Sequence, residues 1–277
     1  MGKIEVSIAN LFKIDGYPGN DLYIERTDHH RLESRCKMQL DVGHLFAHGG
    51  ARNGKTSLVK HILLDRNPIN ILCTNKDTIG SLYSQIYDMI GVHDEEVGTE
   101  GGFSLFGLTL GGSKVVKKSY PQEANSVIKK MLEKDRKYVI LDNVHYLERE
   151  TIKDLAIAIR AFSDKGIRFV MIGVRVKENE FFQFNPDLKG RLEYIEVKAM
   201  SREIINKLLR KLLRAVNVNT NDACINTIIN KVEREPYKVV KAVQIICHEF
   251  GLENRPKKSV KLAQEQLKKI LQGYKFA

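Results

Sequence analysis

The stretch that decides the fold is residues 42–60, which read VGHLFAHGGARNGKTSLVK. Within it, Gly49, Gly54, Lys55 and Thr56 complete the pattern G-x-x-x-x-G-K-T, the signature of a phosphate-binding P-loop. A short apolar run precedes the glycines, and apolar residues at helical spacing follow Thr56. A strand, a loop and a helix in this order are the context that a P-loop requires, so the stretch predicts a nucleotide site.

The residue types of the loop explain how it would hold a nucleotide. Gly49 and Gly54 allow a tight backbone turn, so that successive N–H groups point inward at the β-phosphate. Lys55 would place a positive charge between the β- and γ-phosphates, and the Thr56 hydroxyl would ligate Mg²⁺. The predicted nucleotide-binding loop comprises Gly49, Gly50, Ala51, Arg52, Asn53, Gly54, Lys55, Thr56 and Ser57.

Residues 137–147, KYVILDNVHYL, carry the second chemical signal. Their apolar run predicts a buried strand that ends in Asp142, where a carboxylate associated with Mg²⁺ would lie beside the P-loop. Asn143 follows, at a position where many ATPases carry a glutamate that activates water. An amide can orient water but cannot accept its proton, so hydrolysis is expected to be slow or to use a carboxylate from elsewhere. His145 is either a sensor of the γ-phosphate or a neutral structural histidine.

The bulk composition is that of a soluble globular protein. The chain has 277 residues, of which 43% are hydrophobic and 29% are charged, enough for one large domain or two. No apolar run approaches the roughly 18 residues of a membrane span, and the N-terminus lacks the apolar region of a signal peptide. The four cysteines contain no Cys-x-x-Cys pair, which indicates reduced structural thiols. We therefore expect a cytoplasmic protein without a membrane partner.

The net charge of +11 is unevenly distributed. Residues 201–277 contain 16 Lys and Arg against 7 Asp and Glu, a net charge of +9, whereas the first 200 residues hold 29 basic and 27 acidic groups. This asymmetry indicates either an anionic partner for the C-terminal part or a solvated, soluble helical surface.

The order of the predicted elements indicates an α/β fold. Helices separate predicted strands at 42–48, 69–74, 138–141, 167–172 and 192–197, which is typical of a three-layer αβα parallel sheet. A short helix is expected at 29–39, and Asp77 is expected to be the N-cap of a helix through about Ile90. Residues 91–120 include a glycine-rich segment, 98–112, that predicts a small hairpin or a mobile loop.

After Met200 the pattern is wholly helical, which predicts a small all-helical lid. The first expected helix begins at Ser201, and three more cover residues 221–232, 236–249 and 259–271. The predicted domains are an N-terminal segment, 1–27, a P-loop nucleotide-binding domain, 28–199, and a basic helical lid, 200–277.

Two basic residues outside the loop are further candidates. Arg191 stands just before the last predicted strand and, in an oligomer, could reach a neighbour's γ-phosphate as an arginine finger. The alternative is one exposed arginine among many. Lys238 lies in the first turn of a helix that starts at Pro236, where a lysine opposes the helix dipole. It is either positioned for a phosphate or solvated.

These motifs together resemble AAA+-type ATPases, most closely the origin-recognition-like and STAND branches, over roughly residues 22–250. The phrases that carry the resemblance are YIER at 23–26, GGARNGKTS at 49–57 and ILDNVHYL at 140–147, and LKGRLEYI at 188–195 and REPYK at 234–238 match more loosely.

The resemblance implies ATP between the sheet and the lid, Asp142 as the Walker B acid, Arg191 as the finger and Lys238 near the second sensor position. Three departures from the family pattern stand out. Asn143 replaces the usual second acid, Gly173 stands where a polar first sensor is expected, and REPYK replaces the Gly-x-Pro-Arg of the second sensor.

Three functions fit this sequence. The first is an ATP-dependent switch that forms homo-oligomers and acts on a partner effector protein, which the resemblance places in phage defence or mobile-element biology. The second is an ATPase that assembles on duplex DNA, as transposon target-selection ATPases do, with Lys207, Lys211 and Arg214 on the basic lid in contact with phosphates. The third is a pseudo-ATPase that only binds ATP, since the amide of Asn143 cannot act as a general base.

Overall fold

The computed structural model describes residues 8, 12, 17–19, 21–27, 31–91, 123–174 and 180–274. The glycine-rich segment 98–112 lies outside them. The chain divides into two compact units, one of residues 1–38, 48–62 and 196–277 and one of residues 39–47 and 63–195, and each is described by itself. The domain boundaries expected at 27/28 and 199/200 stay predictions.

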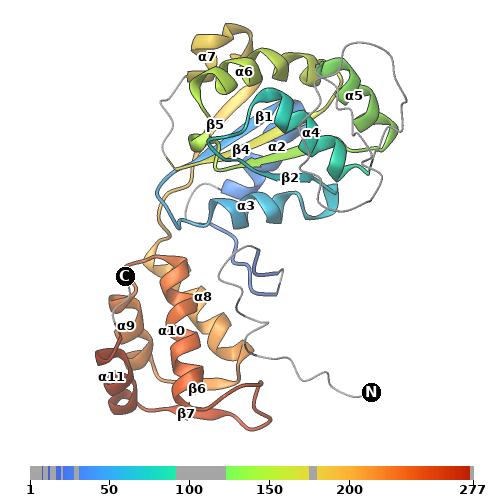
Figure 1. The fold of residues 1–277 in the computed structure, drawn as a ribbon. Helices are drawn as coiled ribbons and strands as arrows, with labels where there is room; N and C mark the ends of the chain where they lie inside the picture. Colours follow the sequence, from blue (N-terminus) through green and yellow to red (C-terminus); the bar gives the residue numbers. More distant parts are fainter. Residues whose placement is uncertain are drawn as a thin grey trace. The chain divides into compact units, whose positions relative to one another are not determined.

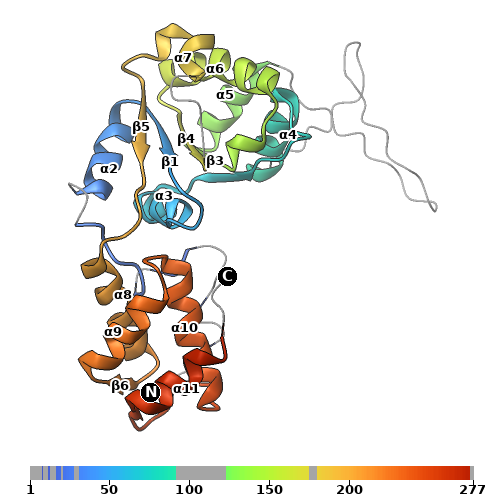
Figure 2. The same cartoon turned by 90° about the vertical axis from the view of Figure 1, so that its left-hand side faces the viewer.

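A five-stranded parallel sheet with flanking helices confirms the predicted fold class (Figure 1). Its strands are β1 (His44–His48), β2 (Ile69–Leu72), β3 (Tyr138–Asp142), β4 (Arg168–Gly173) and β5 (Leu192–Glu196). They are arranged in the order β2-β3-β4-β1-β5, and Figure 2 shows β5, β1, β4 and β3 side by side. Asp142, the last residue of β3, pairs with Leu72 and Ile172 on the neighbouring strands.

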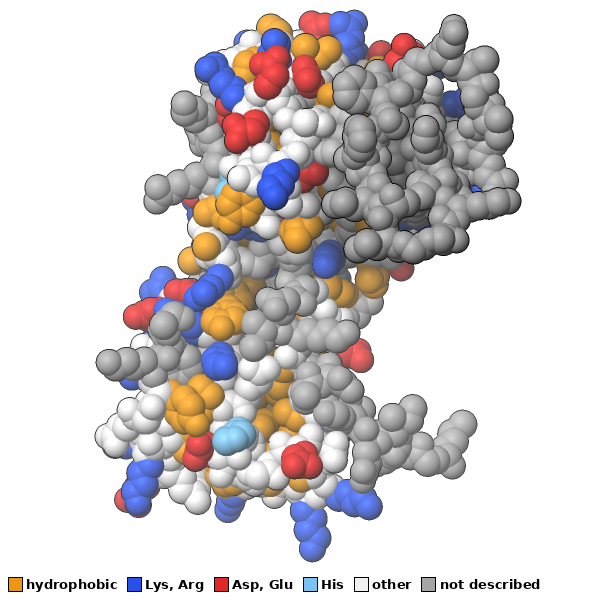
Figure 3. Space-filling view, in the orientation of Figure 1, with side chains coloured by type: hydrophobic (Ala, Val, Ile, Leu, Met, Phe, Trp, Pro, Cys, Tyr) orange, Lys and Arg blue, Asp and Glu red, His pale blue; other side chains and the backbone are white. Residues whose placement is uncertain are grey.

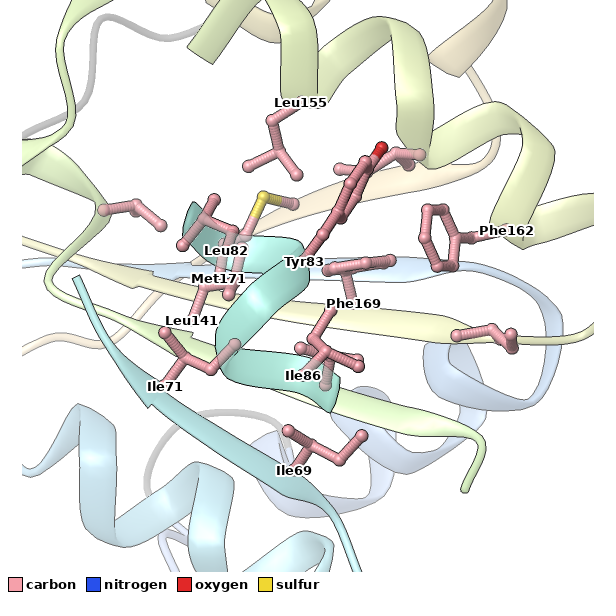
Figure 4. Packing of buried hydrophobic residues seen from close by; sticks show 14 of the residues in the cluster. Ile69, Ile71, Leu82, Tyr83, Ile86, Leu141, Leu155, Phe162, Phe169 and Met171 are labelled. Atoms are coloured by element: carbon pink, nitrogen blue, oxygen red, sulfur yellow. The ribbon is translucent and has the colours of Figure 1, made fainter. Parts of the chain in front are cut away.

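Helices pack on one face of this sheet around a large apolar core (Figure 4). They are α4 (Ile79–Met89), α5 (Ala124–Glu133) and α6 (Arg149–Asp164), followed by the short α7 (Glu180–Phe184). Short 3₁₀ turns lie at Leu64–Arg66, Val144–Tyr146 and Pro186–Leu188.

Side chains of the sheet alternate between two buried faces. Leu141 and Phe169 belong to the core beneath α4 and α6, whereas their neighbours Ile140 and Val170 are equally buried but outside that cluster. Because successive side chains of a strand point to opposite faces, the sheet is covered on both sides, as a three-layer fold requires.

Two helices flank the P-loop strand in the chain, α2 (Leu32–Val42) before β1 and α3 (Lys55–Ile62) after it. The helix predicted at 29–39 therefore runs three residues further than expected, to Val42. Asp77, predicted as the N-cap of α4, is not the cap. Thr78 is, because its side chain accepts the N–H of Ser81.

The carboxylate of Asp77 instead accepts four hydrogen bonds, from Thr74 Oγ1, Ser81, Gln85 and the backbone N–H of Thr74. Burial raises the pKa of this carboxyl, but the hydrogen bonds outweigh burial and hold the pKa below its usual value.

The C-terminal helices form a second core of their own. They are α8 (Arg202–Ala215), α9 (Asp222–Lys231), α10 (Pro236–Glu249) and α11 (Gln264–Gln272). The side chain of Ser201 accepts the N–H of Ile204, which confirms the predicted start of the first of them. The apolar face of α8, which includes Ile205 and Leu209, is fully buried.

Two short strands, β6 (Val218–Thr220) and β7 (Val260–Leu262), pair in parallel beside these helices. The prediction of a helix from residue 259 is wrong for its first turn. Val260 donates its N–H to the carbonyl of Asn217 as part of β7, and the helix starts only at Gln264. The sequence pattern could not show this pairing, because its partner strand lies some forty residues upstream.

None of the described helices has the length and hydrophobicity that a membrane crossing needs. All four cysteines are buried, and none of them is in a disulfide bond.

Candidate nucleotide-binding site

The P-loop begins where β1 ends and continues into α3. Gly49 and Gly54 have φ angles of +140° and +82°, which glycine adopts at little cost because it has no Cβ. A Cβ on Gly49 would lie 2.4 Å from the carbonyl oxygen of Val197, too close for any other residue. Arg52 also has a positive φ, +61°, so three bends shape the loop.

The predicted phosphate-binding lysine is buried at the start of α3. Lys55 is 8% exposed, and its Nζ donates to the carbonyl oxygens of Gly50 at 2.8 Å and Gly49 at 3.2 Å. Its ammonium group therefore lies over the backbone of the loop. Thr56 and Ser57 follow in the first turn of α3, both half-buried.

A buried arginine outside the motif supports the loop. Arg26 is 1% exposed, and its guanidinium donates to the carbonyl of Asn53 at 2.8 Å and to the carbonyl of Lys198. Asn53 in turn donates its side-chain amide to the carbonyl of Val197 at 3.0 Å. These bonds hold the middle of the P-loop to the segment that follows β5.

In the sequence Arg26 is only the last residue of the phrase YIER, and no motif assigns it a role. Its partners lie 27 and 172 residues away along the chain, so no local pattern could reveal them.

The same N-terminal segment is fixed by a buried carboxylate. Glu33 on α2 accepts the Tyr23 hydroxyl at 2.7 Å and the backbone N–H of Arg26 at 2.8 Å. The Tyr23 ring stacks on His61 of α3, with ring centres 3.9 Å apart. Burial, followed by the charge of Glu33, raises the pKa of Tyr23 far above its ordinary value, so this hydroxyl remains a donor.

The loop also touches the first turn of α10. The guanidinium of Arg52 lies 4.6 Å above the centre of the Tyr237 ring, a cation–π contact. An exposed contact of this kind stabilises by roughly 0.5–1 kcal/mol, so it can form and break readily.

Lys238, the next residue, already has two anionic partners. Its Nζ lies 2.6 Å from Glu233 Oε2 and 3.0 Å from Glu235 Oε1. The hydrogen bonds that Lys238 donates to Glu233 and then to Glu235 raise the pKa of Lys238, and the bond to Glu233 lowers the pKa of Glu233. Positive φ angles at Glu233 and Arg234, +50° and +65°, bend the chain ahead of the helix that carries Lys238. A phosphate would have to compete with these carboxylates.

The predicted magnesium carboxylate ends β3, as expected from the sequence. The Asp142 carboxylate accepts the backbone N–H of Asn143 at 2.9 Å, and the Asp142 carbonyl accepts the N–H of Cys73 at 2.8 Å. Asn143 has a φ of +64°, in the left-handed region that asparagine tolerates better than most residues. The Asp142 carboxylate is therefore held against the backbone where the strand turns.

His145 is bonded across to the end of the next strand. Its Nδ1 accepts the N–H of Val174 at 3.4 Å, just after Gly173 ends β4. This bond places a polar ring beside the position where the first sensor is expected and where the sequence itself offers only glycine.

Arg191 lies at the opposite edge of the sheet from Asp142. It immediately precedes β5, and its carbonyl accepts the N–H of His44 at the start of β1 with a length of 2.6 Å. A five-residue strand is about 15 Å long, and β5 lies three strand spacings of about 4.8 Å from β3, so the two residues are about 20 Å apart. The Arg191 guanidinium bonds Asp164 at 2.7 Å, and this bond lowers the pKa of the Asp164 carboxyl.

The structure thus groups the candidate residues in three places. The loop residues 49–57 lie with the supporting Arg26 and, through Arg52, with Tyr237. Asp142 and Asn143 end β3 in the other unit, and Arg191 lies at the far edge of the same sheet. Among the described residues there is no cluster of three or more His, Cys, Asp or Glu side chains that could hold a metal by themselves.

No protein-family model and no curated protein sequence matches the chain. Solved structures do. The ORC2 protein of Aeropyrum pernix matches with a TM-score of 0.59 and 12% identity over 91% of this chain and 69% of that one.

The Walker-type ATPase PABY2304 of Pyrococcus abyssi matches with a TM-score of 0.58 and 17% identity, over 95% and 76% of the two chains. Domain III of the replication initiation protein DnaA of Thermotoga maritima matches with a TM-score of 0.54 and 14% identity, over 98% and 97%. These neighbours are AAA+ P-loop ATPases, and the chain has their fold.

Proposed function

We propose that this protein binds ATP with Mg²⁺, hydrolyses it slowly, and acts as a nucleotide-dependent oligomerising switch for a partner protein. The observation that carries the proposal is the P-loop itself. Its glycines are bent as a phosphate-binding turn requires, and Lys55 is buried at the start of α3 within the fold of AAA+ ATPases.

The loop fits a nucleotide phosphate. Gly49 has no room for a Cβ because the Val197 carbonyl lies against it, so this packing of the loop requires glycine, and the positive φ angles of Gly49 and Gly54 support a turn whose N–H groups can point at a phosphate. On binding, Lys55 would exchange the carbonyls of Gly49 and Gly50 for phosphate oxygens, which are stronger, charged acceptors.

Thr56 and Asp142 are the residues that would hold Mg²⁺, one with a hydroxyl and one with a carboxylate. Oxygen donors of this kind, completed by phosphates and water, suit Mg²⁺, which seldom uses a cage built only of protein groups. Bound Mg²⁺ would neutralise charge on the β- and γ-phosphates.

Slow turnover follows from Asn143. Its amide can donate to and accept from a water molecule but cannot take the proton that attack on phosphorus releases. It therefore orients water beside Asp142 without activating it.

Arg191 would act on a neighbouring copy. At the amino-terminal edge of the sheet it is remote from the strand end that carries Asp142, which supports a role toward a neighbouring copy. To reach a neighbour's γ-phosphate its guanidinium must leave Asp164, an exposed pair that costs about 0–1 kcal/mol to break. Assembly would thus complete the site.

The contact between Arg52 and Tyr237 supplies the link to α10. Because Arg52 belongs to the loop that would surround the phosphates, nucleotide binding would alter its stacking on Tyr237. Lys238 in the same turn would then exchange Glu233 for a phosphate oxygen. The unpaired spacing of the cysteines in the sequence favours the cytoplasm for this switch, and the resemblance to STAND and origin-recognition ATPases favours a role in phage defence or mobile-element biology.

The first test is ATP binding in the presence of Mg²⁺, measured by calorimetry. Lys55→Ala should weaken binding at least about 100-fold, since a charge-assisted contact to phosphate is lost. Lys60→Ala, one turn further along the same helix, is the matched control and should bind as the wild type does. Equal binding by wild type and Lys55→Ala would refute the nucleotide site.

The second test is ATPase rate per protomer against protein concentration. A trans finger predicts a rate that rises with concentration and falls in Arg191→Ala, but not in Arg160→Ala, an exposed arginine paired with Asp187 on the same sheet unit. Mixing Lys55→Ala with Arg191→Ala should restore turnover, because one copy supplies the finger and the other the site. A rate that is independent of concentration would exclude the trans role.

Asn143→Glu tests the missing base. It should raise turnover at saturating ATP without a change in ATP affinity. If the rate stays at zero in this variant and in mixtures, the protein only binds ATP.

A further inference from the structure

A group of exposed basic residues lies in the connection between α10 and α11. Residues 254–264, NRPKKSVKLAQ, connect α10 to α11 through β7 and contain four basic residues and no acidic residue. We call Arg255, Lys257, Lys258 and Lys261 the basic turn. All four side chains are exposed, and Figure 3 shows blue side chains around the end of the helical part where β6 and β7 lie.

None of the four side chains forms an ion pair or a hydrogen bond within the part of the chain that the structure describes. This distinguishes the basic turn from the row on α8 that the sequence favoured. There Lys207 pairs with Glu203 at 2.7 Å, and Lys211 donates to the carbonyl of Tyr23 at 2.7 Å. The charges of that row are partly neutralised or used to hold the chain together.

The backbone of the basic turn is fixed. Asn217, with a φ of +55°, donates its side-chain amide to the carbonyl of Pro256 at 2.9 Å and accepts the N–H of Val260 at 3.0 Å. The pairing of β6 with β7 then continues through Asn219 opposite Lys261. The four cations are therefore presented from an ordered backbone, so binding would cost less conformational entropy than it would for a flexible basic tail.

We propose that the basic turn binds the phosphate backbone of duplex DNA without reading its sequence. From Arg255 to Lys261 the chain spans at most about 21 Å, within which a duplex presents roughly one negative charge per 1.7 Å of its axis. Four unpaired cations at this spacing match such a surface.

Other polyanions fit less well. Residues 254–264 contain no aromatic side chain on which an unpaired base could stack, which disfavours single strands. A membrane surface is disfavoured because the described segment 201–274 exposes no large apolar side chain that could insert. Large exposed hydrophobic residues of the described chain are Met38, Val42, Leu64, Leu72, Met89, Leu132, Tyr146 and Ile157.

The test uses the full chain without nucleotide and a fluorescent duplex of about 24 base pairs, with binding followed by anisotropy. Four phosphate contacts predict a slope of log affinity against log salt of about −3.6, which is roughly a 100-fold loss between 50 and 200 mM salt. Neutralising the turn with R255Q, K257Q, K258Q and K261Q should weaken binding at least tenfold at low salt and bring the slope close to zero.

The matched control removes the same charge from the other unit, with K129Q, K134Q, K165Q and K189Q, all exposed lysines. It should bind the duplex as the wild type does. The proposal is overturned if both variants weaken equally, if the turn variant keeps its affinity, or if single strands, phosphatidylserine vesicles or polyglutamate bind better than the duplex.

This surface is independent of the proposed ATP switch. Lys55→Ala should retain duplex binding in the nucleotide-free assay, and the turn variant should retain ATP binding. Loss of one activity without the other therefore shows which of the two proposals has failed.

Discussion

The buried imidazole of His44, at the start of the strand that leads to the P-loop, predicts a loss of stability in mild acid. His44 is fully buried, its Nδ1 accepts the N–H of Phe169 at 2.9 Å, and its Nε2 has no partner among the described residues. Burial, followed by the charges of Arg168 and Arg191, lowers the pKa of His44 from 6.5 to about 3. The folded protein therefore holds this ring neutral.

The sign and size follow from linkage. Between pH 6.5 and about pH 3 the unfolded chain binds a proton at His44 that the folded chain does not bind. The stability of the folded state that is present above pH 6.5 is therefore lost as the pH falls towards 3. Each pH unit in this window costs about 1.4 kcal/mol, so at pH 5 the free energy of unfolding should be about 2 kcal/mol lower from this residue alone.

The assay is urea unfolding followed by circular dichroism at pH 7.5 and pH 5, for the wild type and His44→Asn. An asparagine side-chain oxygen can accept the N–H of Phe169 but does not titrate, so the variant should lose about 2 kcal/mol less than the wild type between the two pH values. The cavity that it creates lowers stability equally at both. His248→Asn, at a ring that is 84% exposed, is the control. Parallel behaviour of wild type and His44→Asn would refute the reasoning.

Three further predictions concern the nucleotide site. Gly49→Ala should abolish ATP binding because its Cβ meets the Val197 carbonyl at 2.4 Å, whereas Gly50→Ala, which meets only the Asn53 side chain at 3.1 Å, should weaken it by less than about tenfold, as calorimetry would show. Arg26→Met should lower the free energy of unfolding by about 3 kcal/mol, since two buried carbonyls lose a charged donor, and Arg26→Lys should recover part of it. Lys238→Met should reduce ATP affinity about tenfold, whereas removing its competing partner with Glu233→Gln should raise that affinity; no change in either would leave the lysine a purely structural ion pair.

Much of the fold followed from local signals that tertiary contacts reinforced. The strand ending in Asp142 and the helix beginning at Ser201 lie where periodicity and capping put them, because burial of an apolar run and a capping hydroxyl are properties of neighbours in sequence. Two predictions are wrong because a residue or strand has a partner that the sequence pattern does not show. Thr78 rather than Asp77 caps α4, because Asp77 is engaged by Ser81 and Gln85, and β7 replaces a predicted helical turn, because β6 offers it a partner.

The sequence by itself determined the candidate P-loop, since the spacing from Gly49 to Thr56 encodes a turn whose geometry depends on glycine at fixed positions. Only the tertiary structure decided what surrounds it. Arg26 supports the loop through carbonyls far along the chain, and Lys238 carries two carboxylates that a linear motif does not display. The tertiary structure also decided which Lys and Arg side chains remain available to a partner. Charge is a property of composition, but whether a lysine is paired depends on what the fold brings within about 4 Å of it.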